Sequence, residues 1–313
     1  MVLPFLAGCS WDWDRFTSVD DGAPASCSWD DPARFTLEAP ALVPELSSPA
    51  RELDPFLAPD RLSLYFASER GDGKLRSYRA IRSERAGPFD RVEEQSEINV
   101  PGCISRFALS ANGLTAFISA RGDFPGSCGG RFNIYWARRG STADPFTTSQ
   151  FSPTGLNTSQ HELDPFPSND GLRLYYVEDA PTESTTRMLL AERVGSGAVP
   201  EWKRQGPVPG LELASCDADN PALSVDELLI VFSANLSGSV AGSRDLWYAV
   251  RSARNEPFGA PRPLPGVQHR AGRDRGLRHA GRLRALLRPR DGGAGRGDLQ
   301  HALPGALTTI RAS

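Results

Sequence analysis

The stretch RELDPFLAPDRLSLYFASER, residues 51–70, returns later in the chain as HELDPFPSNDGLRLYYVEDA, residues 161–180. Both copies open with Glu-Leu-Asp-Pro-Phe after their first residue. In both, a second aromatic residue, Phe66 or Tyr176, follows that Phe after ten positions. Self-similarity of this kind is the signature of a repeat architecture.

Two weaker copies keep the same spacing, from Phe107 to Phe117 and from Ala222 to Phe232. The four copies begin near residues 54, 105, 164 and 220. The second has Ser105-Arg106 where Asp-Pro stands in the first, and the fourth has Asn220-Pro221. The repeating unit is therefore about 50 to 60 residues long.

Further elements recur downstream in a constant order. Ala-x-Arg follows two large side chains at Ala80, Ala137, Ala191 and Ala249. Pro-Phe follows at Pro88, Pro145 and Pro257, and the third copy has Pro200 to Trp202 instead. Three matched elements in one order exclude chance similarity.

Each copy is typical of four short strands. Asp60-Arg61, Asn112-Gly113 and Asp170-Gly171 are residue pairs that tolerate the positive φ of a tight hairpin. Apolar runs such as LLIVF, ending at Phe232, predict a strand buried on both faces. Four strands in about 50 residues predict an all-β fold, a β-propeller built from four-stranded blades.

The pattern DP-x4-D-x3-LYFAS-x-R resembles the TolB-like propeller repeat, a relative of the WD-type repeat found in bacterial envelope proteins. The resemblance covers residues 35–263 and is closest in the first and third copies. It implies a non-catalytic scaffold that binds an envelope protein or polymer as a monomer and needs no cofactor. Since fold does not fix function, this role is an expectation.

Residues 35–47, FTLEAPALVPELS, look like an outer strand with no preceding partners. We expect it to complete a composite blade with residues 264–313, which gives five blades, or six if a further one is hidden. Those last fifty residues lack Phe, Tyr and Trp and carry ten arginines against three aspartates. They therefore look like a degraded blade.

A frameshift is one explanation of this tail. The chain has 33 arginines and two lysines, which suggests GC-rich DNA. With free choice of synonymous codons, HAGRLRALLR (279–288) can be encoded by DNA whose next frame reads Thr-Pro-Asp-Gly-Cys-Ala-Leu-Tyr-Phe. The alternatives are a basic arm and a bland, disordered extension. A nucleic-acid role is disfavoured, because no aromatic residue is interleaved for stacking.

The N-terminal segment, residues 1–34, contains Leu6-Ala7-Gly8-Cys9, which resembles a bacterial lipobox. It implies export to the periplasm or outer membrane, with a lipid anchor on Cys9 as the only membrane contact. The preceding run, Val2–Leu6, is short for the apolar region of a signal peptide, so a chance match is the alternative.

The other four cysteines form an even set that an exported protein can oxidise. Cys103 and Cys128 fall on one face of one predicted blade, so we expect them to pair, which leaves Cys27 with Cys216. Four free thiols are the alternative. Neither the cysteines nor the histidines have a metal-ligand spacing, so no metal site is expected.

Acidic residues gather where the innermost strands begin. The candidate binding residues are Glu52, Asp54, Glu162, Asp164, Asp217, Asp219 and Asn220. Such a rim favours a cationic ligand, a metal ion or a basic segment. The stronger interpretation is architectural, because Asp54, Asp164 and Asn220 recur in register and such residues cap turns.

Catalytic motifs are absent from the sequence, which has no GxSxG, HExxH or phosphate loop. The enzymatic alternative is a five-bladed glycoside-acting protein in which Asp54 and Asp164 face each other across the channel.

Overall fold

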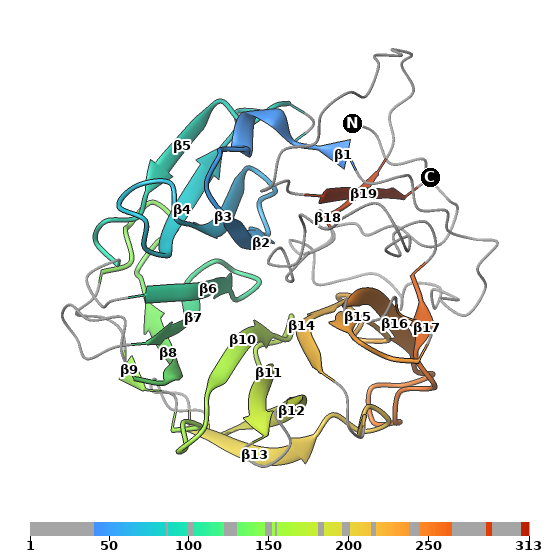
Figure 1. Cartoon of the computed structure of the whole chain (residues 1–313). Coiled ribbons are helices and arrows are strands. Elements are labelled where there is room, and N and C mark those ends of the chain that lie inside the picture. Colours follow the sequence, from blue (N-terminus) through green and yellow to red (C-terminus); the bar gives the residue numbers. More distant parts are fainter. Residues whose placement is uncertain are drawn as a thin grey trace, which may run out of the picture.

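A computed structural model gives the structure of the protein (Figure 1). It describes residues 41–85, 87–98, 103–121, 130–147, 152–153, 155–180, 185–195, 201–213, 217–237, 239, 244–264, 286–289 and 308–312. Within these ranges the only helix is a single 3-10 turn, η3 (Pro44–Leu46), and the rest of the regular structure is β-strand. No helix in these ranges is long and apolar enough to span a membrane.

Four sheets of four antiparallel strands follow one another around a common centre, as the blades of a propeller do (Figure 1). Blade 1 comprises β2 (Glu52–Leu57), β3 (Ser63–Ser68), β4 (Arg76–Ile81) and β5 (Arg91–Glu94). Blade 2 comprises β6 (Cys103–Leu109), β7 (Thr115–Arg121), β8 (Phe132–Arg138) and β9 (Ser152–Pro153). Blade 3 comprises β10 (Glu162–Pro167), β11 (Arg173–Ala180), β12 (Thr185–Val194) and β13 (Glu201–Pro207). Blade 4 comprises β14 (Ala218–Leu223), β15 (Leu229–Ala234), β16 (Asp245–Val250) and β17 (Arg262–Pro263). The predicted all-β propeller and its four recognisable blades are confirmed.

Burial follows the order of the strands within each blade. Every residue of β3 and β15 is buried, as expected of strands covered on both faces, whereas β5 and β13 are largely exposed. Aromatic side chains join adjacent blades. The rings of Tyr65 in blade 1 and Phe107 in blade 2 stack with their centroids 4.6 Å apart.

The first hairpin of each blade has an Asx turn, which the sequence predicted for blades 1 to 3. In each turn a side-chain oxygen accepts a hydrogen bond of 2.8 to 3.0 Å from the main-chain N–H of the leucine two residues later. The accepting residues are Asp60, Asn112, Asp170 and Asp226. The residue after this Asp or Asn has a positive φ, which is 61° at Arg61 and 60° at Glu227, with glycine at 113 and 171. These Asx turns fix the register of each blade at one end.

A fifth sheet joins the two ends of the described chain. Strand β1 (Ala41–Leu42) pairs antiparallel with β19 (Thr308–Ala312), which pairs in parallel with β18 (Leu286–Pro289). An N-terminal strand therefore lies beside C-terminal ones, as a composite closure requires (Figure 1). The sheet has three strands and one parallel pair, unlike the four antiparallel blades.

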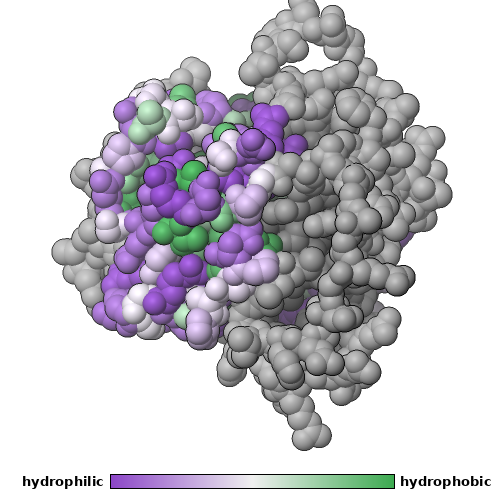
Figure 2. Space-filling view, turned by 90° about the horizontal axis from the view of Figure 1, so that it is seen from above, coloured by the Kyte–Doolittle hydropathy of each residue, from purple (hydrophilic) through white to green (hydrophobic). Residues whose placement is uncertain are grey.

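Figure 2 shows one side of the molecule. Its described surface is mainly hydrophilic, with a small hydrophobic area enclosed within it. Large apolar residues with high exposure are few in the described part of the chain, namely Leu172 and Val194.

Candidate functional site

Three of the predicted rim residues build a repeated β-bulge on the innermost strands. Asp54, Asp164 and Asn220 have φ values of 50°, 51° and 56°, and each precedes a proline. The register with the second strand shifts at each of these positions. In three blades, a residue other than glycine adopts the left-handed conformation at the same place. A feature repeated in this way builds the fold, which agrees with the stronger of the two sequence interpretations.

Arg106 takes this position in blade 2. Each of the three bulge residues lies six positions before the Asp of the hairpin turn, and Arg106 lies six before Asn112. The sequence alignment had placed Ser105 there, so the structure shifts that copy by one residue. The bulge of β6 falls between Ile104 and Arg106, next to the expected place.

The Arg106 guanidinium is buried near the centre of the propeller. The residue is 1 % exposed, and its Nη2 donates to the carbonyl oxygen of Pro221 in β14 at 3.0 Å. Its side chain thus reaches from blade 2 to blade 4. The four equivalent positions hold two carboxylates, one amide and one guanidinium, so the fold supplies its own cation at the place where an acidic rim was expected to attract one.

The remaining rim residues are also engaged within the protein. Arg70 Nη2 lies 3.1 Å from Glu52 Oε1, and Arg244 binds both Asp219 and Asp217. Of these carboxylates Asp217 is the most accessible, with a side chain 23 % exposed, whereas that of Asp219 is buried. These three rim carboxylates therefore contact arginines of their own fold.

Glu162 is buried beside Thr158. The Thr158 N–H and hydroxyl donate to Glu162 Oε1 at 2.9 and 2.5 Å. Burial raises the pKa of Glu162 above its usual value, and the hydrogen bonds from Thr158 offset part of this rise. In the neighbouring bulge, Asp164 Oδ2 accepts the Asn220 N–H at 3.2 Å, which ties blade 3 to blade 4.

The arginine of the repeated Ala-x-Arg element explains why the other elements recur. In Arg82, Arg139 and Arg251, Nε donates to the carbonyl oxygen of the left-handed turn residue, Arg61, Gly113 or Glu227, at 2.7 to 2.9 Å. The same guanidinium lies over the Pro-Phe ring, Phe89, Phe146 or Phe258, at 4.4 to 4.8 Å from its centroid. We call this arrangement the arginine clamp. Sequence reasoning recognised its three parts but missed that one side chain joins them.

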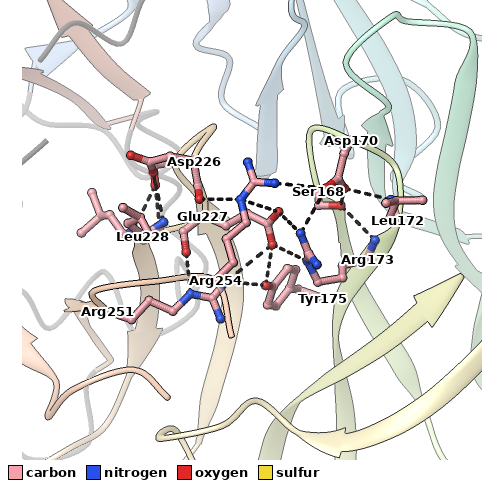
Figure 3. A network of polar contacts seen from close by, with 12 residues as sticks. Ser168, Asp170, Leu172, Arg173, Tyr175, Asp226, Glu227, Leu228, Arg251 and Arg254 are labelled. Atoms are coloured by element: carbon pink, nitrogen blue, oxygen red, sulfur yellow. Dashed lines mark hydrogen bonds and ion pairs between the residues drawn. The ribbon is translucent and has the colours of Figure 1, made fainter. Parts of the chain in front are cut away.

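Between blades 3 and 4 the clamp extends into a buried ionic network (Figure 3). Arg173 donates two hydrogen bonds of 2.7 Å to Glu227, and the Tyr175 hydroxyl donates a third at 2.8 Å. Arg251 Nη2 donates to the Tyr175 oxygen at 3.2 Å. Glu227 is fully buried, and its carboxylate raises the pKa of the Arg173 guanidinium above its ordinary value. The network fills the space between the two first hairpins.

The corresponding space between blades 2 and 3 is a cavity of about 210 Å³. Thr115 stands where blade 3 has Arg173, and Gly171 stands where blade 4 has Glu227, so neither side of the ion pair is present. Phe117 replaces Tyr175, and Trp202 follows Pro200 where the other blades have Pro-Phe. The lining of the cavity includes Thr115, Phe117, Gly171 and Trp202, together with Arg138 and Arg193.

Two aromatic rings and two cations shape this cavity. The rings of Phe117 and Trp202 meet edge to face with centroids 5.8 Å apart. Asp170 is also part of the lining, but Arg173 and Arg254 lie 3.1 and 3.3 Å from its carboxylate. Although burial opposes it, hydrogen bonds from Ser168 and Leu172 and these two arginines lower the pKa of Asp170. Arg138 and Arg193 supply the other charged side chains of the lining.

Several sequence predictions fall outside the described residues. Cys9, Cys27, Cys128 and Cys216 lie there, as do residues 1–34. Only the backbone of Cys103 is described, as the first residue of β6. The lipid anchor and both disulfide pairs therefore stay predictions. The described residues hold no group of three or more His, Cys, Asp or Glu arranged for a metal ion.

No family model matches the chain, and no curated protein matches it. Among solved structures it is similar to TolB from Acinetobacter baumannii, with 15 % identity and a TM-score of 0.43 over 75 % of this chain. It spans 56 % of that TolB chain. A thermostable family-43 glycoside hydrolase shows 16 % identity and a TM-score of 0.46 over 71 % of this chain and 75 % of that one.

A putative TolB from Agrobacterium tumefaciens shows 17 % identity and a TM-score of 0.42 over 74 % of this chain and 69 % of that one. The neighbours thus include both TolB proteins and a glycoside hydrolase, and none of them decides the function of this chain. Its assignment as a β-propeller rests on its own strand order and register.

Proposed function

We propose that this protein is a non-catalytic β-propeller scaffold of the bacterial cell envelope that binds an envelope protein or polymer. The supporting observation is the contrast between repeated and unrepeated polar groups. Groups that recur in three or four of the blades, namely the bulge residues, the Asx turns and the clamp arginines, are bound within the fold. The cavity between blades 2 and 3 departs from this pattern, and a ligand site is expected to be asymmetric.

The central carboxylates support the same proposal. Asp54 and Asp164 are 1 % and 0 % exposed, and Asp164 accepts a main-chain hydrogen bond from the next blade. A glycosidase needs two carboxyl groups that reach a sugar and a water molecule. Carboxylates that hold bulges in place are expected to build the fold instead.

Export and anchoring through Cys9 belong to this proposal as well. They follow from the lipobox-like sequence, and an oxidising compartment suits the two expected disulfide pairs. Labelling with radioactive palmitate, with Cys9→Ser as the control, tests the anchor. Loss of label in the variant supports it, and equal label in both chains contradicts it.

Affinity capture tests the binding function. The full chain, immobilised, is incubated with a detergent extract of bacterial envelopes, and bound protein and carbohydrate are both quantified. We expect one class to be enriched over a heat-denatured sample of the same chain. Recovery no greater than on the denatured chain would contradict the proposal.

A further inference from the structure

We infer that the cavity between blades 2 and 3 binds one uncharged sugar ring, as a unit of an envelope polymer. This inference rests on the proposed binding function and names the chemical class of its ligand. The cavity exists because Thr115 and Gly171 stand where the next junction has Arg173 and Glu227. An added Cβ at Gly171 would meet no atom within 4 Å, so the open space begins at the main chain.

The surface beside the cavity also breaks the repeat. The leucine of the Asx turn is partly covered in three blades, at Leu62, Leu114 and Leu228. In blade 3 the equivalent Leu172 follows Gly171 of the lining and is 52 % exposed. The Arg193 N–H donates to the Leu172 carbonyl oxygen at 2.8 Å, which places the end of β12, with the exposed Val194, beside this turn. Exposed apolar residues that gather at one place are typical of a binding site.

The charged groups of the lining are already engaged within the protein. Arg173 and Arg254 lie 3.1 and 3.3 Å from the carboxylate of Asp170. Arg138 and Arg193 also interact with groups of the protein itself. A charged ligand would therefore lose its hydration without meeting an unengaged counter-charge in this lining. An uncharged ligand leaves the existing contacts in place, so the cavity favours a neutral molecule.

The neutral groups of the lining are complementary to a sugar. Phe117 and Trp202 supply aromatic surface against which the C–H face of a ring can pack. Asn112 and Asn169 supply amide groups whose nitrogens make no hydrogen bond to another described residue. Aromatic surface with a few polar groups that fix orientation is usual in a small-ligand site. Because polar residues outnumber apolar ones in the lining, a sugar fits better than an apolar side chain of a protein.

The size of the cavity limits the ligand to one ring. Its volume of about 210 Å³ exceeds the roughly 150 Å³ of a cavity that accommodates benzene. It is below the roughly 300–1,000 Å³ of pockets for drug-sized molecules. Asn112 and Asp170 belong to the lining and are exposed, so the cavity opens to solvent. One sugar of a polymer can therefore enter while the chain continues outside.

NMR titration of the full chain tests the inference. The probes are glucose, galactose and mannose as neutral hexoses, galacturonate as an acidic one, and the capped peptide Ac-Ser-Phe-Ser-NH2. We expect at least one neutral hexose to bind with a Kd of about 1 to 10 mM, as befits a one-ring ligand. Galacturonate should bind no more tightly than galactose.

Three results would contradict the inference. Failure of all three neutral hexoses to bind would exclude the sugar site. Binding of galacturonate about tenfold tighter than that of galactose would show that the cavity recognises charge. Binding of the peptide tighter than that of every hexose would assign the cavity to a protein partner instead.

Two asparagine variants separate the site from the fold. Asn169→Ala should weaken the best hexose about three- to tenfold, because a hydrogen bond to the ligand is lost. Asn133→Ala removes a partly buried asparagine of β8 that lies outside the lining, and it should leave binding unchanged. Equal affinities of the wild type and Asn169→Ala would count against the assignment.

The double variant Thr115→Arg/Gly171→Glu rebuilds the ion pair of the next junction within the cavity. Gly171 and Glu227 have nearly the same φ, 69° and 60°, so the backbone accepts the change. We expect hexose binding to be lost while the unfolding midpoint in urea is unchanged or higher. Retained binding would refute the site. If the double variant still captures envelope material, the proposed function stands and this inference fails.

Discussion

The Nε of Arg251 donates to the main-chain carbonyl oxygen of Glu227 at 2.7 Å, and the same guanidinium lies 4.4 Å from the centroid of the Phe258 ring. One side chain thus connects the first hairpin of blade 4 to the loop before its outer strand. Three blades repeat this arginine clamp, which explains why Asx turn, Ala-x-Arg and Pro-Phe recur together.

We predict that Arg251→Met lowers the free energy of unfolding by about 2–3 kcal/mol, because a buried charged hydrogen bond and its partner contact are lost. Arg91→Met removes an exposed arginine of β5 and should cost less than about 0.5 kcal/mol. Urea denaturation of both variants measures this. Equal losses would show that the clamp does not stabilise its blade.

We predict that the positive charge of Arg106 offsets the free-energy cost of burying the carboxylates at the equivalent positions, Asp54 and Asp164. Arg106→Met should destabilise the protein by about 3–5 kcal/mol, the usual cost of removing one partner from a buried ionic group. Arg106→Lys should recover part of the loss, and Arg91→Met on the exposed β5 should change stability by less than about 0.5 kcal/mol. Unchanged urea midpoints for Arg106→Met would contradict this role.

The raised pKa of Glu162 predicts a pH dependence of stability. Burial favours the protonated form of Glu162 in the native state. The stabilising contribution of this protonation is complete below the pKa of the unfolded state, near 4.5. It is lost as the pH rises through the pKa of the folded state. The wild type should therefore lose stability relative to Glu162→Gln as the pH rises above about 4.5. Urea titrations at several pH values measure the difference. A gap that stays constant or changes in the opposite direction would exclude this account.

The C-terminal segment carries a prediction at the level of the gene. The fifth sheet contains a parallel pair, β18 with β19, where the four blades are antiparallel. If residues 264–313 come from a shifted frame, resequencing should find that a single-base change opens a frame with the Asp-Gly turn and the Leu-Tyr-Phe strand of a blade. If no single-base change opens such a frame, the hypothesis is excluded.

The repeat predicted the blades because it records local chemistry. The Asx turn at Asp170-Gly171 and the buried run ending at Phe232 depend on neighbours in sequence, and both were found where expected. Arg106 was misplaced by one residue, because the bulge of β6 differs from those of the other blades.

The cavity was missed for a different reason. It arises from side chains that are small or absent, Thr115 and Gly171, and their significance depends on a partner blade some 56 residues away. Comparing equivalent positions of consecutive copies, rather than looking for conserved ones, would have shown the missing ion pair. The signal in the sequence was Gly171, at the position where the next copy has Glu227.

The central claim is that the propeller binds an envelope protein or polymer without catalysing its cleavage. The most direct measurement incubates the full chain with a bacterial envelope polysaccharide and quantifies both the bound fraction and the newly formed reducing ends. The account predicts saturable binding with the polymer recovered at its original length. A time-dependent increase in reducing ends that depends on Asp54 or Asp164 would contradict it and establish the enzymatic alternative.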